Sequence, residues 1–212
     1  MDYLCYRLSG LPAEISNPEL LDATELTTYR QRGELYLKSR CLLKRELARR
    51  LHSHPRDIRF RITEHGKPEL PESRLHFNLS HTADLLCLAF HHAPVGIDIQ
   101  QLRPASATNR LARRIMCKRQ LSAWQQRGES IAEFFCCWCA AEALVKHAGA
   151  TIWQALDFPF LYHPEGCIEA LFSSAPTIRI FTPQLGVQGA VAYTTLPLPT
   201  EEQAVTITGS DL

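Results

Sequence analysis

The chain has 212 residues, of which 45% are hydrophobic and 21% are charged. A chain of this length and composition can bury a substantial hydrophobic core, which excludes disordered, collagen-like and mini-protein classes. Its 23 Lys and Arg residues against 22 Asp and Glu residues leave a formal net charge of +1, which argues against a general nucleic-acid binder.

No apolar segment approaches the roughly 20 residues of a transmembrane helix. The N-terminal segment also lacks the basic and then apolar pattern of a signal peptide. We therefore expect a soluble, cytoplasmic protein that makes no contact with membranes.

The first half of the sequence predicts one long helix followed by short strands. Residues 34–51 follow a helical pattern, because Leu43, Leu47 and Leu51 recur every four positions. The dipeptide His54-Pro55 ends this helix. Alternating or continuous apolar residues then predict strands at 58–62, 75–79, 85–90 and 95–99, with a turn at 66–68.

The second half repeats this pattern of one long helix and about three strands. Residues 101–107 are predicted to be a linker, and a helix is expected at 109–116. The strongest helical stripe covers 131–148. Strands follow at 167–172, 178–181 and 187–193, and the polar tail from Pro197 is predicted to be irregular. Short gaps between strands favour antiparallel pairing and hence an α+β fold.

Eight cysteines occur in the chain, at positions 5, 41, 87, 117, 136, 137, 139 and 167. Without a signal peptide, reduced thiols are favoured over disulfides. Cys136 and Cys139 form a C-x-x-C pair inside the predicted helix 131–148, where packing thiols are expected; a metal or redox pair is the alternative.

Two segments are strongly basic. Residues 38–61 contain nine Lys and Arg residues, and residues 103–127 contain seven and no acidic residue. Such segments are most often solvated faces, but they also suit an anionic small ligand and an acidic protein surface.

Glu142 is the most informative single residue. It lies four positions after Trp138, on the apolar stripe of the predicted helix, and Lys146 lies four positions further along the same face. One interpretation is an ion pair at the edge of the core. The other is a buried carboxylate that binds a cation or moves a proton, for which a charged partner is expected.

Asp98 is a candidate for that partner. It lies on the polar face of the strand 95–99, and Gln100 shares that face. Two oxygen ligands from a strand and one from a helix would suit Mg²⁺, which often bridges to phosphate oxygens. The alternative is an aspartate that makes a local hydrogen bond.

Ser80 and His81 follow a predicted strand and precede a turn. They are interpreted either as local hydrogen-bonding residues or as donors to a phosphate. No glycine-rich phosphate loop and no G-x-S-x-G motif occurs, so Rossmann, P-loop and hydrolase-elbow interpretations have little support.

Three segments occur in a fixed order: Phe77-Asn78-Leu79-Ser80-His81-Thr82, then Val95-Gly96-Ile97-Asp98-Ile99, and then residues 135–146. Taken together, they resemble the signatures of the Sfp-type 4′-phosphopantetheinyl transferases. Gly66-Lys67-Pro68 and the basic helix that contains Arg40 and Lys44 also fit. The match covers residues 35–150.

The resemblance implies two similar α+β halves, each with a long helix on a small, mainly antiparallel sheet, related by pseudo-two-fold symmetry. We expect these halves at 1–102 and 103–212, with the active site in the cleft between them and the protein a monomer. The implied reaction transfers 4′-phosphopantetheine from coenzyme A, with Mg²⁺, to a serine of an acyl or peptidyl carrier protein.

The resemblance also implies roles for individual residues. Asp98, Gln100 and Glu142 would bind Mg²⁺, and Glu142 would also be the base for the carrier serine. Lys146 would neutralise charge on the pyrophosphate as its bond breaks. A further set would hold the phosphates of coenzyme A: Arg40, Lys44, Lys67, Ser80 and His81.

Two positions depart from the signatures. Gln100 replaces the third acidic ligand, and Ala141 replaces the lysine before the helix glutamate. These departures motivate an alternative, a weakened homologue that binds coenzyme A or a carrier protein without transfer. The basic segment 103–127 is expected to meet the acidic helix of a carrier protein through Arg113 and Arg114.

Overall fold

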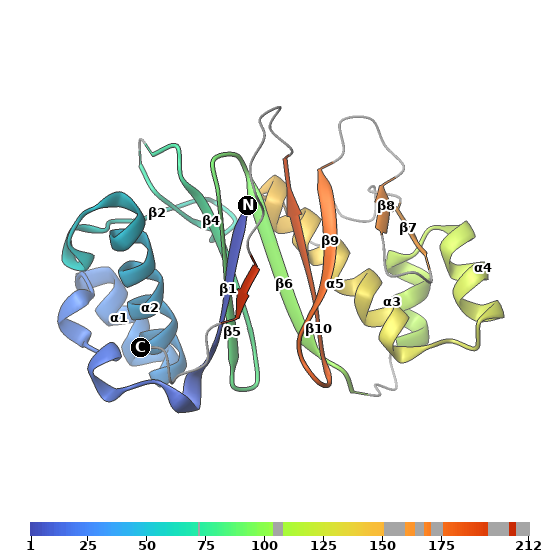
Figure 1. The fold of residues 1–212 in the computed structure, drawn as a ribbon, viewed down its shortest axis with the longest axis horizontal. Helices are drawn as coiled ribbons and strands as arrows, with labels where there is room; N and C mark the ends of the chain where they lie inside the picture. Colours follow the sequence, from blue (N-terminus) through green and yellow to red (C-terminus); the bar gives the residue numbers. More distant parts are fainter. Residues whose placement is uncertain are drawn as a thin grey trace.

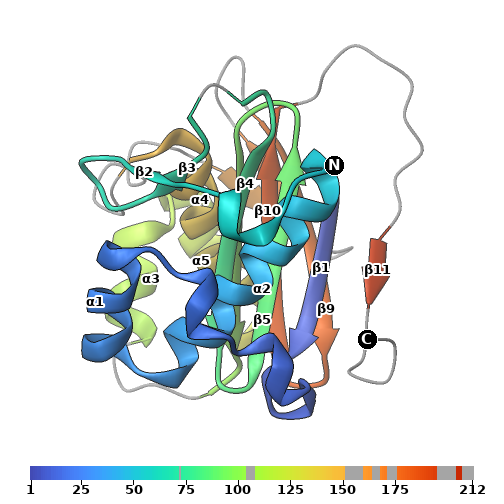
Figure 2. The same ribbon diagram turned by 90° about the vertical axis from the view of Figure 1, so that its left-hand side faces the viewer.

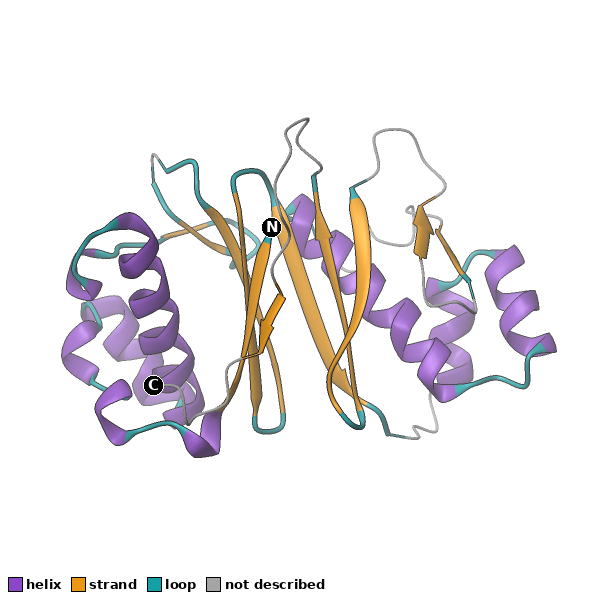
Figure 3. Ribbon diagram, viewed as in Figure 1, coloured by secondary structure: helices purple, strands orange, loops and turns teal. Residues whose placement is uncertain are grey.

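The computed structural model describes residues 1–71, 73–103, 108–150, 160–163, 168–170, 176–194 and 204–206. It has four layers: helices, a four-stranded sheet, a three-stranded sheet and helices again (Figures 1 and 3). Within these residues, no helix is both long and apolar enough to cross a bilayer.

The first two layers combine α2 with the four-stranded sheet, whose strand order is β11-β1-β5-β4. Helix α2 (Glu34–Leu51) covers one face of this sheet, and α1 (Ala23–Arg32) packs against α2 away from the strands (Figure 2). The strands are β1 (Asp2–Arg7), β4 (His76–Thr82), β5 (Leu85–His91) and β11 (Ala204–Thr206). The hairpin strands are β2 (Arg61–Ile62) and β3 (Pro68–Glu69), and 3-10 helices lie at Leu8–Gly10, Ala13–Ile15, Pro18–Leu20 and Pro55–Asp57.

The other two layers combine the three-stranded sheet, in the order β6-β10-β9, with α5. The strands are β6 (Val95–Gln101), β9 (Thr177–Gln184) and β10 (Val187–Tyr193). The helices are α3 (Thr108–Ile115), α4 (Lys118–Gln126) and α5 (Ile131–Ala148). A small sheet pairs β7 (Phe160–Tyr162) with β8 (Ile168–Ala170).

The hydrophobic core follows the two-residue period of the strands. On β5, Leu86, Leu88 and Phe90 pack against α2, while Leu85, Cys87 and Ala89 face the second sheet. On β6, three apolar side chains face the first sheet: Val95, Ile97 and Ile99. Each central strand is therefore buried on both faces, and the opposite face of β6 is left to meet α5.

The sequence predicted most of these elements and their antiparallel pairing. Helices α2 and α5 and strand β10 have the predicted bounds, and among the described residues every strand pair is antiparallel except β1 with β11. The α+β fold class is thereby confirmed. Strands β1 and β11 and helices α1 and α4 were not anticipated.

Two predictions of secondary structure were wrong. The strand expected at 58–62 is reduced to Arg61–Ile62, because Ile58 is buried directly after the 3-10 helix Pro55–Asp57. The tail expected to be irregular contributes β11, which pairs in parallel with β1. The predicted linker at 101–107 and strand at 167–172 lie partly outside the described residues.

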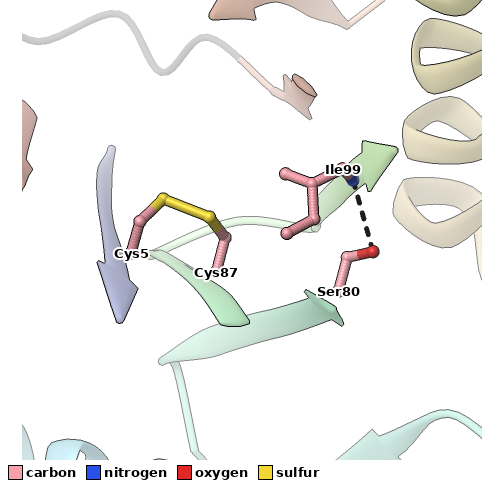
Figure 4. The surroundings of a disulfide bond; sticks show 4 residues. All are labelled: Cys5, Ser80, Cys87 and Ile99. Carbon is pink, nitrogen blue, oxygen red and sulfur yellow. Dashed lines mark hydrogen bonds between the residues drawn. A yellow bond between two sulfur atoms is a disulfide. The ribbon is translucent and has the colours of Figure 1, made fainter. Parts of the chain in front are cut away.

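The expectation of reduced thiols was wrong for one pair, because Cys5 and Cys87 form a disulfide (Figure 4). The two residues lie directly opposite on the antiparallel strands β1 and β5, with Cα atoms 4.2 Å apart. Such close opposition is typical of a non-hydrogen-bonded pair in an antiparallel ladder. The disulfide lies in the core between the two sheets, and the Ile99 side chain points toward it.

The division of the chain into halves at residues 1–102 and 103–212 stays a prediction. Two strands lie in the sheet of the other half: β6 pairs with β10, and β11 pairs with β1.

Candidate functional site

The candidate site lies where β6 meets α5, on the face of the strand that carries Gly96, Asp98 and Gln100. Helix α5 begins at the cap of Ser130, whose side chain accepts a hydrogen bond from the Glu133 amide. It ends at Gly149, which has a φ of 66°. These two caps set the length of the helix that presents Glu142 and Lys146 to β6.

Gly96 lets the helix approach the strand closely. A Cβ atom at this position would lie 2.1 Å from the Ala143 carbonyl oxygen and 2.4 Å from the His147 amide nitrogen. Any other residue would therefore push α5 away from β6. This contact brings the side chains of Glu142 and Lys146 to the level of Asp98 on the strand.

Asp98 is the hydrogen-bonding centre of the site and is only 2% exposed. Its Oδ1 accepts from Ser80 Oγ at 2.8 Å and from Lys146 Nζ at 2.7 Å. Its Oδ2 accepts from Gln100 Nε2 at 3.1 Å. Three hydrogen-bond donors, one of which is the positively charged Lys146 ammonium group, stabilise the carboxylate in this buried position.

Glu142 lies beside this cluster with its charge uncompensated by direct contact. Within the described part of the chain, its carboxylate forms no hydrogen bond and no ion pair. Burial raises the pKa of Glu142, the negative charge of Asp98 raises it further, and Lys146 opposes both. A half-buried, unpaired carboxylate next to a second carboxylate is a favourable place for a cation or a proton.

Lys146 connects the site to the backbone of β6 as well as to Asp98. Its ammonium group also donates to the Ile97 carbonyl oxygen at 3.1 Å. An ammonium group has three N–H donors, so one remains for a ligand. The side chain is 27% exposed, which leaves it accessible from solvent.

Lys67 lies at the C-terminal end of α5. Its ammonium group donates to the carbonyl oxygens of Lys146 at 2.6 Å and Val95 at 3.4 Å. Burial lowers the pKa of Lys67, and the charge of Glu69 opposes this change. Lys67 thus joins the hairpin between β2 and β3 to the strand and helix that carry the site.

Ser80 and His81 are adjacent on β4 but point to different environments. The single hydroxyl proton of Ser80 is donated to Asp98, so a contact with a phosphate would require that bond to exchange. His81 is exposed; partial burial and the charge of Lys146 lower its pKa, and the charge of Asp98 opposes them.

Arg40 and Lys44 belong to a separate cluster on α2. Lys44 has no exposed surface; its Nζ lies 2.6 Å from Glu25 Oε2 and donates to the Leu20 carbonyl oxygen at 2.8 Å. This burial argues against the expected contact of Lys44 with a ligand. Arg40 lies 3.4 Å from the same glutamate and over the Phe60 ring, and its contact with a ligand stays a prediction.

The two departures from the expected signatures have different surroundings. The side-chain amide nitrogen of Gln100 donates a hydrogen bond to the Asp98 carboxylate. Ala141 is 1% exposed and packs in the core formed by α3, α4, α5 and the second sheet. A lysine at position 141 would have no room for its charged end in this core.

The cysteines of α5 behave as packing thiols. Burial raises the pKa of Cys136 to about 11 and that of Cys139 well above its usual value. Across the described ranges, no group of three His, Cys, Asp or Glu side chains is arranged to hold a metal ion. Cys139 lies near Asp98, whose negative charge also raises the pKa of the thiol, and its Sγ donates to the Gln188 carbonyl oxygen at 3.4 Å. No spacing in the sequence indicates this neighbour of the site.

The site offers oxygen donors of the kind that Mg²⁺ prefers. Asp98 and Glu142 supply hard carboxylate oxygens, and Glu142 is half-buried and has no partner among the described residues. Mg²⁺ is usually held by one or two carboxylates, with water and phosphate oxygens completing its coordination. Two carboxylates and an amide are therefore compatible with Mg²⁺.

Comparison with known proteins gives a consistent result. Residues 94–207 match the family model of the 4′-phosphopantetheinyl transferase superfamily. The chain is 31% identical over 129 residues to "4′-phosphopantetheinyl transferase Sfp" of Bacillus subtilis, covering 59% of this chain and 57% of the relative. It is 31% identical over 150 residues to "4′-phosphopantetheinyl transferase HetI" of Nostoc sp., covering 68% and 63%.

A third relative is "4′-phosphopantetheinyl transferase AcpT" of Escherichia coli K12, which is 32% identical over 104 residues. That alignment covers 47% of this chain and 53% of the relative. The chain thus spans between about half and two thirds of the length of the curated relatives it matches.

Proposed function

Because the chain belongs to the 4′-phosphopantetheinyl transferase superfamily, we propose that it transfers the 4′-phosphopantetheine group of coenzyme A to a serine hydroxyl of a carrier protein. The observation that carries this proposal is the carboxylate of Glu142, which has no hydrogen-bond or ion-pair partner among the described residues, beside the Lys146–Asp98 ion pair. This arrangement joins a proton acceptor to a cation that can stabilise a phosphate.

The reaction exchanges one phosphorus–oxygen bond for another. The carrier serine oxygen forms a bond to the phosphorus of the pantetheine phosphate, and the bond from that phosphorus to adenosine 3′,5′-bisphosphate breaks. Glu142 accepts the serine proton, directly or through a water molecule. Its lack of a hydrogen-bond partner among the described residues leaves the carboxylate available for this proton.

Lys146 stabilises the charge that develops on the phosphate oxygens. Phosphoryl transfer depends mainly on positioned cations and on orientation, because the protein has little covalent chemistry to perform. The Asp98 carboxylate and the Ile97 carbonyl oxygen fix the ammonium group, so its third N–H points in a defined direction. Lys67, Ser80, His81 and Arg40 are the further residues proposed to hold phosphates of coenzyme A.

Asp98 and Glu142 would hold Mg²⁺, with Gln100 as the third oxygen donor if its amide turns. When bound, this ion supplies positive charge for the pyrophosphate of coenzyme A. Gln100 contributes no charge, so we expect weaker metal binding than a third carboxylate would give. The Asp98 carboxylate already accepts three hydrogen bonds, which also opposes metal binding.

The proposed activity is tested by intact-mass spectrometry of a panel of apo carrier proteins after incubation with the protein, coenzyme A and Mg²⁺. At least one carrier should gain the mass of one phosphopantetheine group, and Asp98→Ala should abolish that gain. If no carrier gains mass at any Mg²⁺ concentration, the proposed transfer is wrong.

A homologue that binds coenzyme A or a carrier without transfer is the second candidate. The hydrogen bond from Gln100 to Asp98 favours it, because this bond occupies the second carboxylate oxygen. Calorimetry that detects coenzyme A binding without a mass gain on any carrier would support this candidate. If Gln100→Glu then conferred transfer, the missing carboxylate would be identified as the cause.

The carrier is proposed to be acidic and to dock on α3. Arg110, Arg113 and Arg114 are exposed on this helix, which contains no acidic residue. Charge reversal at Arg113 should raise the KM for the carrier and leave the KM for coenzyme A unchanged. Equal changes in both constants would contradict this docking site.

We further propose that the halves 1–102 and 103–212 frame the site and that the protein acts as a cytoplasmic monomer. Light scattering after size-exclusion chromatography tests the monomer, and a dimer mass at assay concentrations would overturn it.

A further inference from the structure

Strands β4 and β6 are edge strands of the two sheets and contact each other without sharing a backbone ladder; Figure 4 shows one of their contacts, between Ser80 and Ile99. Side chains of β4 accept hydrogen bonds from the N–H groups of β6 instead. Each of three alternate amides of β6 donates to a side-chain oxygen of β4 nineteen positions earlier in the chain. These bonds are Ile97 to Asn78 at 3.0 Å, Ile99 to Ser80 at 3.3 Å and Gln101 to Thr82 at 3.3 Å.

Two carbonyl oxygens on the same edge of β6 also accept hydrogen bonds from side chains. Val95 accepts from Lys67, and Ile97 accepts from Lys146. Side chains thus satisfy at least five backbone groups on this edge of β6, which lowers the cost of leaving a buried strand edge without a backbone ladder. We call this row of side-chain contacts the β4–β6 seam.

The Ile97 peptide is the point where the seam meets the candidate site. Its N–H donates to Asn78 Oδ1, and its C=O accepts from Lys146 Nζ. The next residue is Asp98, which accepts from the same ammonium group. Any rotation of the Ile97 backbone would therefore move both partners of Lys146 together.

We propose that Asn78 is a positioning residue that fixes the Lys146–Asp98 pair through the Ile97 peptide; this inference rests on the proposed transfer. Asn78 lies on β4 of the four-stranded sheet and is only 6% exposed. Its carboxamide oxygen accepts a hydrogen bond from the Ile97 N–H. Its role is distinct from that of Ser80, which contacts Asp98 directly. The alternation of Asn78, Ser80 and Thr82 places all three side chains on the face of β4 that meets β6.

Replacing Asn78 with alanine should release the Ile97 peptide and loosen the direction of the Lys146 ammonium group. Misplacement of a positioned group by about 1 Å can cost on the order of 100-fold in rate. We therefore expect Asn78→Ala to lower kcat by about 10- to 100-fold, while the KM for coenzyme A changes by less than about threefold.

Thr82→Val is the matched control, because it removes the same kind of contact at the far end of the seam. Its hydroxyl oxygen accepts a hydrogen bond from the amide of Gln101, an exposed residue at the end of β6 that forms no hydrogen bond with Lys146 in the described part of the chain. Thr82→Val should leave kcat unchanged. Asn78→Ser, whose shorter side chain leaves space for water, replaces Asn78→Ala if that variant does not fold.

The experiment combines three measurements on wild type and both variants: amide hydrogen exchange by NMR, thermal unfolding, and transfer kinetics. Asn78→Ala should lose protection against hydrogen exchange at the Ile97 amide, and Thr82→Val should lose it at the Gln101 amide. When the variants are compared at equal stability, only Asn78→Ala should have a lower kcat. Unchanged Ile97 protection, or a kcat loss no larger than that of Thr82→Val, would overturn the positioning role. Failure of wild type to transfer at all would overturn the proposed function instead, and the carrier assay reveals that before any variant is compared.

Discussion

Two lysine–carboxylate pairs, one on each long helix, have nearly equal distances and different surroundings. On α2, Lys44 Nζ lies 2.6 Å from Glu25 and has no exposed surface. On α5, Lys146 Nζ lies 2.7 Å from Asp98, its side chain is 27% exposed, and beside it lies Glu142, which has no partner among the described residues. The ion pair alone therefore does not distinguish a structural cluster from a functional one. The α5 cluster differs in two ways: Lys146 is accessible to solvent, and a second carboxylate, that of Glu142, lies beside the pair.

The largest expected difference between the two pairs is in stability. Lys44→Met should lower the free energy of unfolding by about 3–5 kcal/mol, because it leaves the buried Glu25 carboxylate with only the longer, 3.4 Å contact to Arg40. Lys146→Met should cost less stability, because the Lys146 side chain is 27% exposed, so water can take its place, and because Ser80 and Gln100 still donate to Asp98. It should nevertheless abolish transfer. Urea unfolding of both variants checks this, and equal losses of stability would remove the distinction between the pairs.

The disulfide extends the comparison to the first sheet, which we regard as scaffold. Cys5 and Cys87 are 82 positions apart in the sequence. Closing a loop of that length stabilises a fold by up to about 4 kcal/mol in the chain-entropy description. The double variant Cys5→Ala/Cys87→Ala should therefore unfold at lower urea concentration while its folded fraction keeps the wild-type kcat. A lower kcat at full folding would connect the scaffold to the site.

The smallest effect concerns His147, next to Lys146 on α5. Burial lowers its pKa to about 4, and the positive charges of Lys67, His91 and His76 act in the same direction. A histidine that stays neutral in the folded state costs stability only where the unfolded chain binds the proton. Stability should thus fall as pH decreases from about 6.5 toward 4. His147→Gln should flatten that part of the stability profile, and an unchanged profile would assign it to other groups.

How much the sequence could predict depends on the range of each signal. The periods of α2, α5 and β10 are local, so their bounds could be predicted from apolar spacing alone. Asp98, Glu142 and Lys146 were placed together through family resemblance, and the structure brings their side chains into one electrostatic cluster.

Contacts between distant segments could not be predicted in this way. Lys44 pairs with Glu25 on α1, nineteen positions earlier in the chain, and no local spacing indicates this pair. The ligand contact expected for Lys44 came from the family resemblance and stays a prediction. Polar residues at alternate positions of β4 are typical of a solvent-facing strand, yet Asn78 and Ser80 are buried against β6. Nothing local indicates that the edge of another strand lies there.

The most direct test of the account is single-turnover transfer by wild type, Glu142→Gln and Glu25→Gln, measured by the intact mass of the carrier. General-base catalysis contributes roughly 10²- to 10⁴-fold, so Glu142→Gln should lose transfer by that factor without losing stability. Glu25→Gln should lose stability and, when folded, transfer at the wild-type rate. A Glu142→Gln protein that transfers as fast as wild type would contradict the account.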